Sequence, residues 1–201
     1  MGGGVQTLLM GGCAQVRTLG GLGDCLSMRG LDCSQGTGLQ TIGRLNGLLL
    51  LQWVDLSSCD CLTELDGLRG CDALETLLLS ACSALVDVRG LRSCRSLRFL
   101  DLGKCRSLKN VGCLGNCPSL HTINLEGCPN VSEEKILELL EVGGWKAEVI
   151  TKDPRSPRWF VHPRRQCAHP RPGLWPSLQG ERDFWDSQER FPPPVVGELK
   201  G

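Results

Sequence analysis

The chain has 201 residues, with 22 lysines and arginines balanced by 22 aspartates and glutamates. A dedicated nucleic-acid-binding protein carries a clear basic excess, so the neutral balance argues against that class. Residues 1–10 lack the basic start of a secretory signal, and the longest apolar run, 48–51, is far shorter than the roughly 20 residues that cross a bilayer. The composition therefore predicts a cytoplasmic protein without a transmembrane segment.

From residue 5 onward the chain repeats a unit of 23 residues. Leucine recurs at this interval, at Leu51, Leu74, Leu97 and Leu120. A cysteine follows each of these leucines by eight residues, at Cys59, Cys82, Cys105 and Cys128. The frame continues backwards through two earlier units near residues 5 and 28, where Gly36 replaces the cysteine of the second unit. The sequence therefore predicts about six stacked repeats.

The first half of each unit predicts a short β-strand. Apolar and other residues alternate there, as in Leu100, Asp101 and Leu102, and this period of two places every second side chain on one buried face. The second half also repeats, since the pattern at 62–71 returns at 85–94. It is too short for a long helix, so we expect turns or 3₁₀ pieces, with glycine where the backbone path is tight.

Most of the 13 cysteines recur at fixed positions of the unit, and their number is odd. A thiol at a repeated position stacks beside its own copies as a small apolar group. We therefore expect reduced, buried thiols, and a disulfide framework of the kind found in secreted domains is the alternative.

In this pattern the chain resembles the leucine-rich repeat family, in its short cysteine-containing form, over residues 5 to about 131. Units of this kind are similar to those of protozoan and plant-type leucine-rich repeat proteins. The resemblance implies a repeat solenoid, a right-handed α/β-type coil with short parallel strands on the concave face and turns or 3₁₀ pieces on the convex face. It also implies that partners bind the concave face.

The two ends of the repeat array, which we assign to residues 1–131, differ from each other. Ser132 is a predicted helix N-cap and 145–150 predicts a last strand, so we assign 132–150 to a C-terminal capping helix and strand. At the other end Val5 begins directly in a repeat. An open strand edge is a pairing site, so this end predicts edge-to-edge self-association.

The composition changes after residue 150. Nine of the 11 prolines lie in 151–201, where nine basic residues face six acidic ones, and this predicts a disordered Pro-rich tail. The segment 191–194 has polyproline character but matches known ligand motifs incompletely. Cys167, His162 and His169 match no common zinc spacing and lack a fourth ligand, so we expect no metal there.

The repeats offer no constellation for catalysis. His121 is their single histidine and lies beside a strand, where a surface histidine is ordinary, and no glycine-rich segment has the phosphate-binding form. No pair of cysteines has the CxxC form of a zinc site. We therefore predict a non-enzymatic protein with no cofactor and no metal.

The strand positions that are not leucine form the candidate binding surface. By the resemblance they line the concave face, and Trp53 and Phe99, predicted to be exposed, are of the type that dominates interface energetics. The alternative is structural, because an aspartate between strand leucines is common in such repeats and a tryptophan can pack on its neighbour. The predicted partner is a protein, with nucleic acid not expected. The predicted partner-binding residues are Trp53, Asp55, Ser57, Thr76, Leu78, Ser80, Phe99, Asp101, Thr122, Asn124 and Glu126.

Residues 89–109 form a second candidate surface, which we call the basic segment. Its basic residues are Arg89, Arg92, Arg95, Arg98, Lys104, Arg106 and Lys109. Few acidic residues lie near them in the sequence, namely Asp87 and Asp101. Together with the basic tail, this segment favours an alternative function, electrostatic association with nucleic acid or a membrane. The competing interpretation is a solvated convex face.

Overall fold

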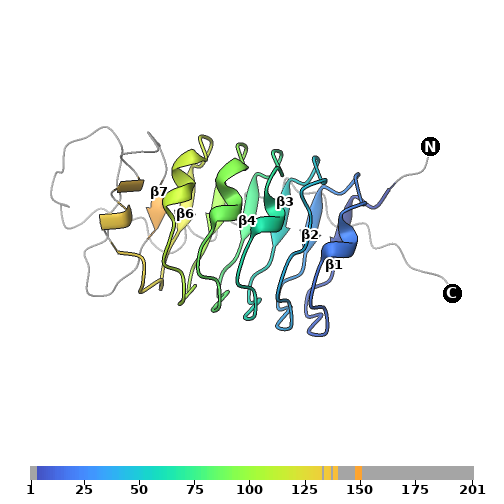
Figure 1. Cartoon of the computed structure of the whole chain (residues 1–201), viewed down its shortest axis with the longest axis horizontal. Coiled ribbons are helices and arrows are strands. Elements are labelled where there is room, and N and C mark those ends of the chain that lie inside the picture. The colour runs from blue at the N-terminus through green and yellow to red at the C-terminus, as the bar shows by residue number, and fades with distance from the viewer. Residues whose placement is uncertain (1–3, 133, 137, 140–147, 151–201) are drawn as a thin grey trace, which may run out of the picture. The chain divides into compact units, whose positions relative to one another are not determined.

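The computed structural model describes residues 4–132, 134–136, 138–139 and 148–150. Within this part of the chain, seven strands form one parallel sheet in chain order (Figure 1). They are β1 (Thr7–Leu9), β2 (Gly30–Asp32), β3 (Trp53–Asp55), β4 (Thr76–Leu78), β5 (Phe99–Asp101), β6 (Thr122–Asn124) and β7 (Glu148–Ile150). The predicted disordered tail, with Cys167, His162, His169 and the segment 191–194, lies outside the described residues.

The 23-residue period of the sequence is also the period of the sheet. Each strand pairs with the next in one register, so that Trp53 pairs with Thr76 and Thr76 with Phe99. Every step from β1 to β6 is 23 residues, whereas the step from Thr122 to Glu148 takes 26. Parallel neighbours require a crossover connection, and the second half of each unit supplies it.

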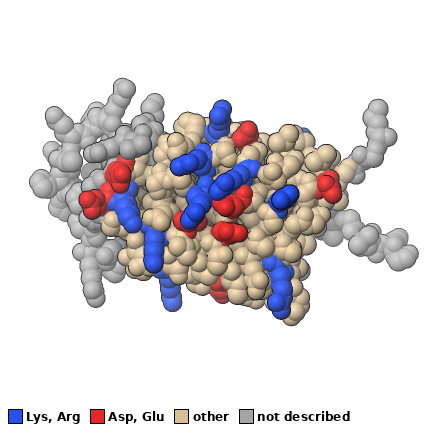
Figure 2. Space-filling model, viewed as in Figure 1, with Lys and Arg blue, Asp and Glu red and all other residues tan. Residues whose placement is uncertain are grey.

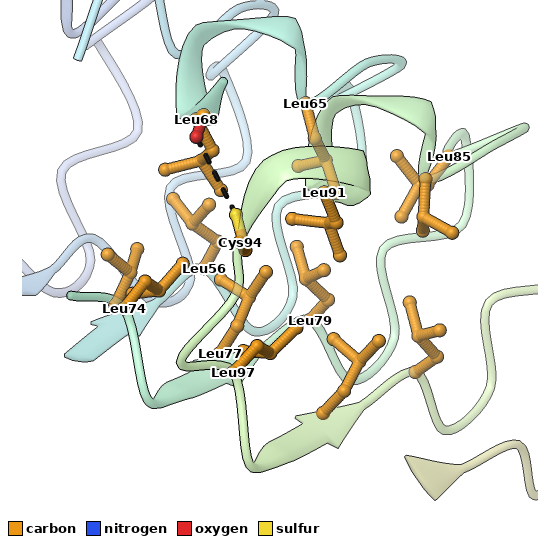
Figure 3. Close-up of a cluster of buried hydrophobic side chains, with 14 of the residues drawn as sticks. Leu56, Leu65, Leu68, Leu74, Leu77, Leu79, Leu85, Leu91, Cys94 and Leu97 are labelled. Carbon is orange, nitrogen blue, oxygen red and sulfur yellow. Dashed lines mark hydrogen bonds between the residues drawn. The ribbon is translucent and has the colours of Figure 1, made fainter. Parts of the chain in front are cut away.

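Leucine side chains fill the space between the strands and the opposite side of the coil. The central residues of β2 to β6 are all buried, and Leu77 and Leu100 are 0% exposed. Figure 3 shows leucines of successive repeats, such as Leu56 and Leu79, in one continuous cluster. A single unit could not bury these side chains, each of which contributes about 1.5–3 kcal/mol when fully buried. The predicted repeat register is confirmed.

The second halves of four units contain 3₁₀ turns, as predicted. They are η1 (Gly20–Leu22), η2 (Asp66–Leu68), η3 (Arg89–Ser93) and η4 (Gly112–Asn116), on the side of the coil away from the strands (Figure 1). Glycine is required there by close contact between repeats. A Cβ on Gly67 would lie 1.8 Å from the carbonyl oxygen of Gly43, and one on Gly90 would lie 2.1 Å from that of Leu65. The described part of the chain folds as a leucine-rich repeat solenoid.

The turn after each of the strands β1 to β6 contains a residue in the left-handed region. Ser58 and Ala81 adopt φ of 60° and 62°, although neither is glycine. This conformation directs their N–H groups to the next repeat, where they donate to the carbonyl oxygens of Ser80 and Gly103, each at 2.7 Å. The left-handed conformation costs a residue with a Cβ about 1–2 kcal/mol. The hydrogen bond between repeats offsets this cost.

The buried cysteines form a hydrogen-bonded series along the coil. From Cys59 onward each buried thiol donates to a backbone carbonyl of the preceding repeat, as in Cys82 Sγ to Leu56 O at 3.1 Å. Figure 3 shows the bond from Cys94 Sγ to Leu68 O, which is 3.7 Å long. Burial raises the pKa of the Cys94 thiol to about 12. The twelve cysteines of the described residues are free, and eight of them are buried, which confirms the predicted burial for those eight. The reduced state of the thiols stays a prediction.

A capping structure follows the last repeat. The residues after Ser132 begin a helix, and Ser132 Oγ accepts a hydrogen bond from the backbone N–H of Lys135 at 3.4 Å. Lys135 Nζ donates to Lys109 O in the previous repeat at 3.0 Å. Leu139 and Val149 are buried against the core. The division of the chain into three parts stays a prediction.

The amino end of the array is packed less tightly. Strand β1 has no second neighbour within the described residues. Val5 and Leu9 are 53% and 52% exposed, and Leu8 is only partly buried, unlike the central residues of β2 to β6. Gly36, which stands at the cysteine position of the second unit, lines a small cavity together with Met10 and Cys13.

Candidate functional site

The predicted partner-binding residues lie together on the outward side of β3 to β6 and on the turns that follow these strands. We call this surface the sheet face. Its first row is Trp53, Thr76, Phe99 and Thr122. Its second row is Asp55, Leu78, Asp101 and Asn124. The turn residues Ser57, Ser80 and Glu126 form a third row. All eleven are partly exposed, Trp53 and Phe99 included.

Trp53 is held in place by the neighbouring strand. Gly30 is its partner in β2, and a Cβ on Gly30 would lie 2.2 Å from Cε2 of the indole. The ring therefore lies over the backbone of Gly30, which is the packing that the structural alternative described. The sequence contained this signal, because Gly30 and Trp53 occupy the same position of successive units.

The polar residues of the second row also have a structural role, because they stabilise the turns that follow the strands. Oδ1 of Asp55 accepts a hydrogen bond from the backbone N–H of Ser57 at 2.8 Å, and Oδ1 of Asp101 accepts one from Gly103 at 2.8 Å. Asn124 does the same with its amide oxygen at 2.9 Å from the N–H of Glu126. A side chain that accepts from the residue two positions later stabilises the turn that leaves the strand.

The surroundings of Asp101 on the sheet face perturb its carboxyl group. Burial raises its pKa above the ordinary value, and the negative charges of Asp55 and Glu126 act in the same direction. The hydrogen bonds from Gly103 and from Asn124 Nδ2, the latter at 2.9 Å, oppose this shift. Among the described residues, neither Asp55 nor Asp101 forms an ion pair with a lysine or arginine.

The basic segment does not form a single patch. Arg89 and Arg92 lie on η3, on the side of the coil away from the strands, and Lys104 lies in the turn that follows β5. Arg89 Nη2 forms an ion pair with Asp87 Oδ2 at 2.5 Å. The charges of Asp66 and Glu64 from the previous repeat also raise its pKa, so the expectation of few acidic neighbours was wrong. Figure 2 shows basic and acidic side chains intermixed on the face in view.

The described residues offer little else to bind a small group. No cluster of three or more His, Cys, Asp or Glu side chains in this part of the chain is placed to hold a metal ion. His121 is exposed and interacts with the backbone oxygen of Ser119. None of the helices that the structure describes has the length and hydropathy of a membrane-spanning segment.

No protein-family model and no curated protein matches the sequence. Two solved structures with a similar chain path are internalins of Listeria monocytogenes. Internalin F is 15% identical with a TM-score of 0.45 over 63% of this chain, and internalin C2 is 18% identical with a TM-score of 0.44 over 67%. The chain spans 41% of the first internalin and 66% of the second. The fold assignment rests on the parallel sheet and the 23-residue frame themselves.

Proposed function

We propose that this chain is a non-enzymatic protein–protein interaction module, an adaptor or regulatory scaffold, whose partner binds the sheet face. The observation that carries the proposal is the grouping of two aromatic rings with two carboxylates on adjacent positions of β3 and β5. Aromatic residues surrounded by polar groups are typical of the central part of a protein interface. The rigid sheet beneath them would present the whole set without a cost for ordering the backbone.

Two finer assignments belong to this proposal. The cysteine at a fixed position of a 23-residue unit supports a relationship to the short repeats of protozoan and plant-type leucine-rich repeat proteins. The free thiols of the described residues support a reducing compartment such as the cytoplasm, since secreted domains of this cysteine content form disulfides.

Self-association is a second proposed contact, at the opposite end from the capping helix. Val5 and Leu9 are exposed at β1, one edge of which has no partner strand among the described residues. A strand edge with apolar side chains is a template for another strand. Sedimentation analysis across a hundredfold concentration range tests this contact. A Leu9→Lys variant should remain monomeric where the unaltered chain dimerises, and a chain that is monomeric throughout would refute it.

The test of the sheet face is an affinity capture with mass-spectrometric identification of the bound proteins. The unaltered chain is compared with a Trp53→Ala, Phe99→Ala double variant, and Val86→Ala, which lies away from the sheet face, is the matched control. All three must first show comparable thermal stability. A partner that the double variant loses and the control retains supports the proposal. Recovery of the same partners by all three proteins would refute it.

The same capture distinguishes the alternative, electrostatic association through the basic segment and tail. Binding to nucleic acid or to an anionic membrane falls steeply as salt is added, because it releases counterions. Recognition at the sheet face should tolerate an increase from 0.1 to 0.5 M salt better. The mixed charges around Arg89 do not favour the electrostatic alternative.

A further inference from the structure

We infer that the sheet face recognises an arginine of its protein partner, with the guanidinium lying over Leu78 between the carboxylates of Asp55 and Asp101. This inference rests on the proposed function and names the chemistry of the partner. It requires an extended or exposed partner segment, because the residues involved are partly exposed side chains on neighbouring strands of a sheet.

The register of three strands creates the arrangement. Strand β4 lies between β3 and β5, so Leu78 is flanked by Asp55 and Asp101, and Thr76 is flanked by Trp53 and Phe99. All of these side chains are partly exposed. Adjacent strands lie about 4.8 Å apart, so residues that flank β4 are about 10 Å from each other. On β4, Leu78 therefore has a carboxylate on either side, and Thr76 has an aromatic ring on either side.

Charge complementarity points to a cationic occupant. The two carboxylates accept hydrogen bonds only from neutral groups in the described part of the chain, namely backbone N–H groups and the amide of Asn124. No lysine or arginine neutralises them there. Each carboxylate accepts the hydrogen bond of its turn through Oδ1, and we assign Oδ2 to the ligand. A partner cation would therefore bring the counter-charge that this surface lacks.

The separation of the carboxylates selects a guanidinium over a metal ion. Metal–oxygen bonds are about 2.0–2.6 Å long, so one ion cannot reach two carboxylates about 10 Å apart. A guanidinium is planar and carries donors on two edges, so it can donate directly to one carboxylate and through a bridging water to the other. Its weakly hydrated flat face packs on an apolar group such as Leu78 and interacts with aromatic rings.

The fold supplies a matched variant for the test. Asn124 occupies the same position as Asp55 and Asp101 and forms the same turn through its amide oxygen. An Asp55→Asn, Asp101→Asn double variant should therefore keep both turns while it loses both charges. Asp32→Asn is the control, because Asp32 forms the same turn with Ser34 at 2.8 Å but lies on β2, away from Leu78.

The probe is a set of acetylated heptapeptide libraries with arginine, lysine or leucine fixed at the central position and mixed residues elsewhere. Binding to the full-length chain is measured by isothermal titration and by amide chemical shifts of β3 to β5. We expect the arginine library to bind at least tenfold more tightly than the leucine library. The Asp55→Asn, Asp101→Asn variant should lose this preference, and Asp32→Asn should retain it.

Three outcomes would overturn the inference. The first is equal binding of the arginine and leucine libraries, and the second is an unchanged preference in the double variant. The third is equal binding of the lysine and arginine libraries, because it would show that a planar cation is not needed. Affinity capture separates this failure from failure of the proposed function. Partners lost with Trp53→Ala, Phe99→Ala but retained with Asp55→Asn, Asp101→Asn would leave the sheet face as the binding surface and refute arginine recognition. Partners retained by both variants would refute the proposed function itself.

Discussion

Alkaline pH should unfold this protein over a narrow range, because its core contains protonated thiols. Eight buried cysteines have a pKa raised by burial to about 11 or above, from an ordinary value of 9.0. Below pH 8 the thiols are protonated in both the folded and unfolded chain and contribute no pH dependence. Above pH 8 the unfolded chain releases protons that the folded chain retains, so the free energy of unfolding falls as the pH rises.

The size of the loss follows from the ionisation of the unfolded chain alone. Each thiol with a pKa of 9.0 stabilises the unfolded state by about 0.4 kcal/mol at pH 9 and by about 1.4 kcal/mol at pH 10. Eight such thiols give about 3 kcal/mol at pH 9 and about 11 kcal/mol at pH 10. Domains are stable by about 5–15 kcal/mol, so a chain whose free energy of unfolding at pH 7 is below about 11 kcal/mol unfolds by pH 10. The absence of tyrosine removes phenol ionisation as a competing cause.

The assay is urea unfolding followed by circular dichroism from pH 7 to pH 10, in the presence of a phosphine reductant. A Cys82→Ala, Cys105→Ala double variant should be less stable at pH 7 but should lose about a quarter less stability between pH 8 and pH 10. Cys61→Ser is the control, because Cys61 is exposed and should not change the slope. A free energy of unfolding that stays constant from pH 8 to pH 10 would refute the assignment of these thiols to the core.

Three further predictions test the packing. Leu100→Ala should lower the free energy of unfolding in urea by about 2–5 kcal/mol, because Leu100 is 0% exposed. Val86→Ala, at a site 40% exposed, should lower it by at most about 0.5 kcal/mol. An unchanged melting temperature for Leu100→Ala would contradict the repeat register. Ala81→Gly should raise the free energy of unfolding by about 0.5–1 kcal/mol, since Ala81 has φ of 62°, and a loss of stability would contradict the left-handed turn. Among the cysteines of the described residues, brief alkylation at pH 7.5 with peptide mapping should modify Cys13 and Cys61 first, and equally fast labelling of the buried thiols would exclude their place in the core.

The sequence predicts the core of this fold well, because the leucines that recur every 23 residues are the residues that form the core. A residue that must be apolar in every unit, such as Leu77 or Leu100, is one that faces the neighbouring units. The glycines of the second half were expected for a tight backbone path. The structure gives the reason for Gly67 as an approach of another repeat's carbonyl within 1.8 Å of where its Cβ would lie, which no local pattern contains.

Contacts between repeats are where prediction from the sequence was weakest. The sequence places Cys82 in a buried column but does not show that its thiol donates to Leu56 O, because that depends on how the carbonyl is directed across two repeats. The acidic surroundings of Arg89 were missed for a simpler reason. Glu64 and Asp66 precede Asp87 and Arg89 by one unit, so they are distant along the chain but adjacent on the coil.

The sheet face differs from the core in how freely its residues vary between units. The inner position of the strands is always a medium-sized apolar residue, whereas the first outward position ranges from Gly30 to Trp53. Asn124 forms the turn with a neutral acceptor, and Leu78 precedes the same kind of turn with no side-chain acceptor at all. The charges of Asp55 and Asp101 are therefore not required by the fold. For this reason the exchange of Asp55 and Asp101 for asparagine removes the charges and keeps the acceptors of the turns. An exchange for alanine would remove both, so it could not separate the structural role of this position from recognition.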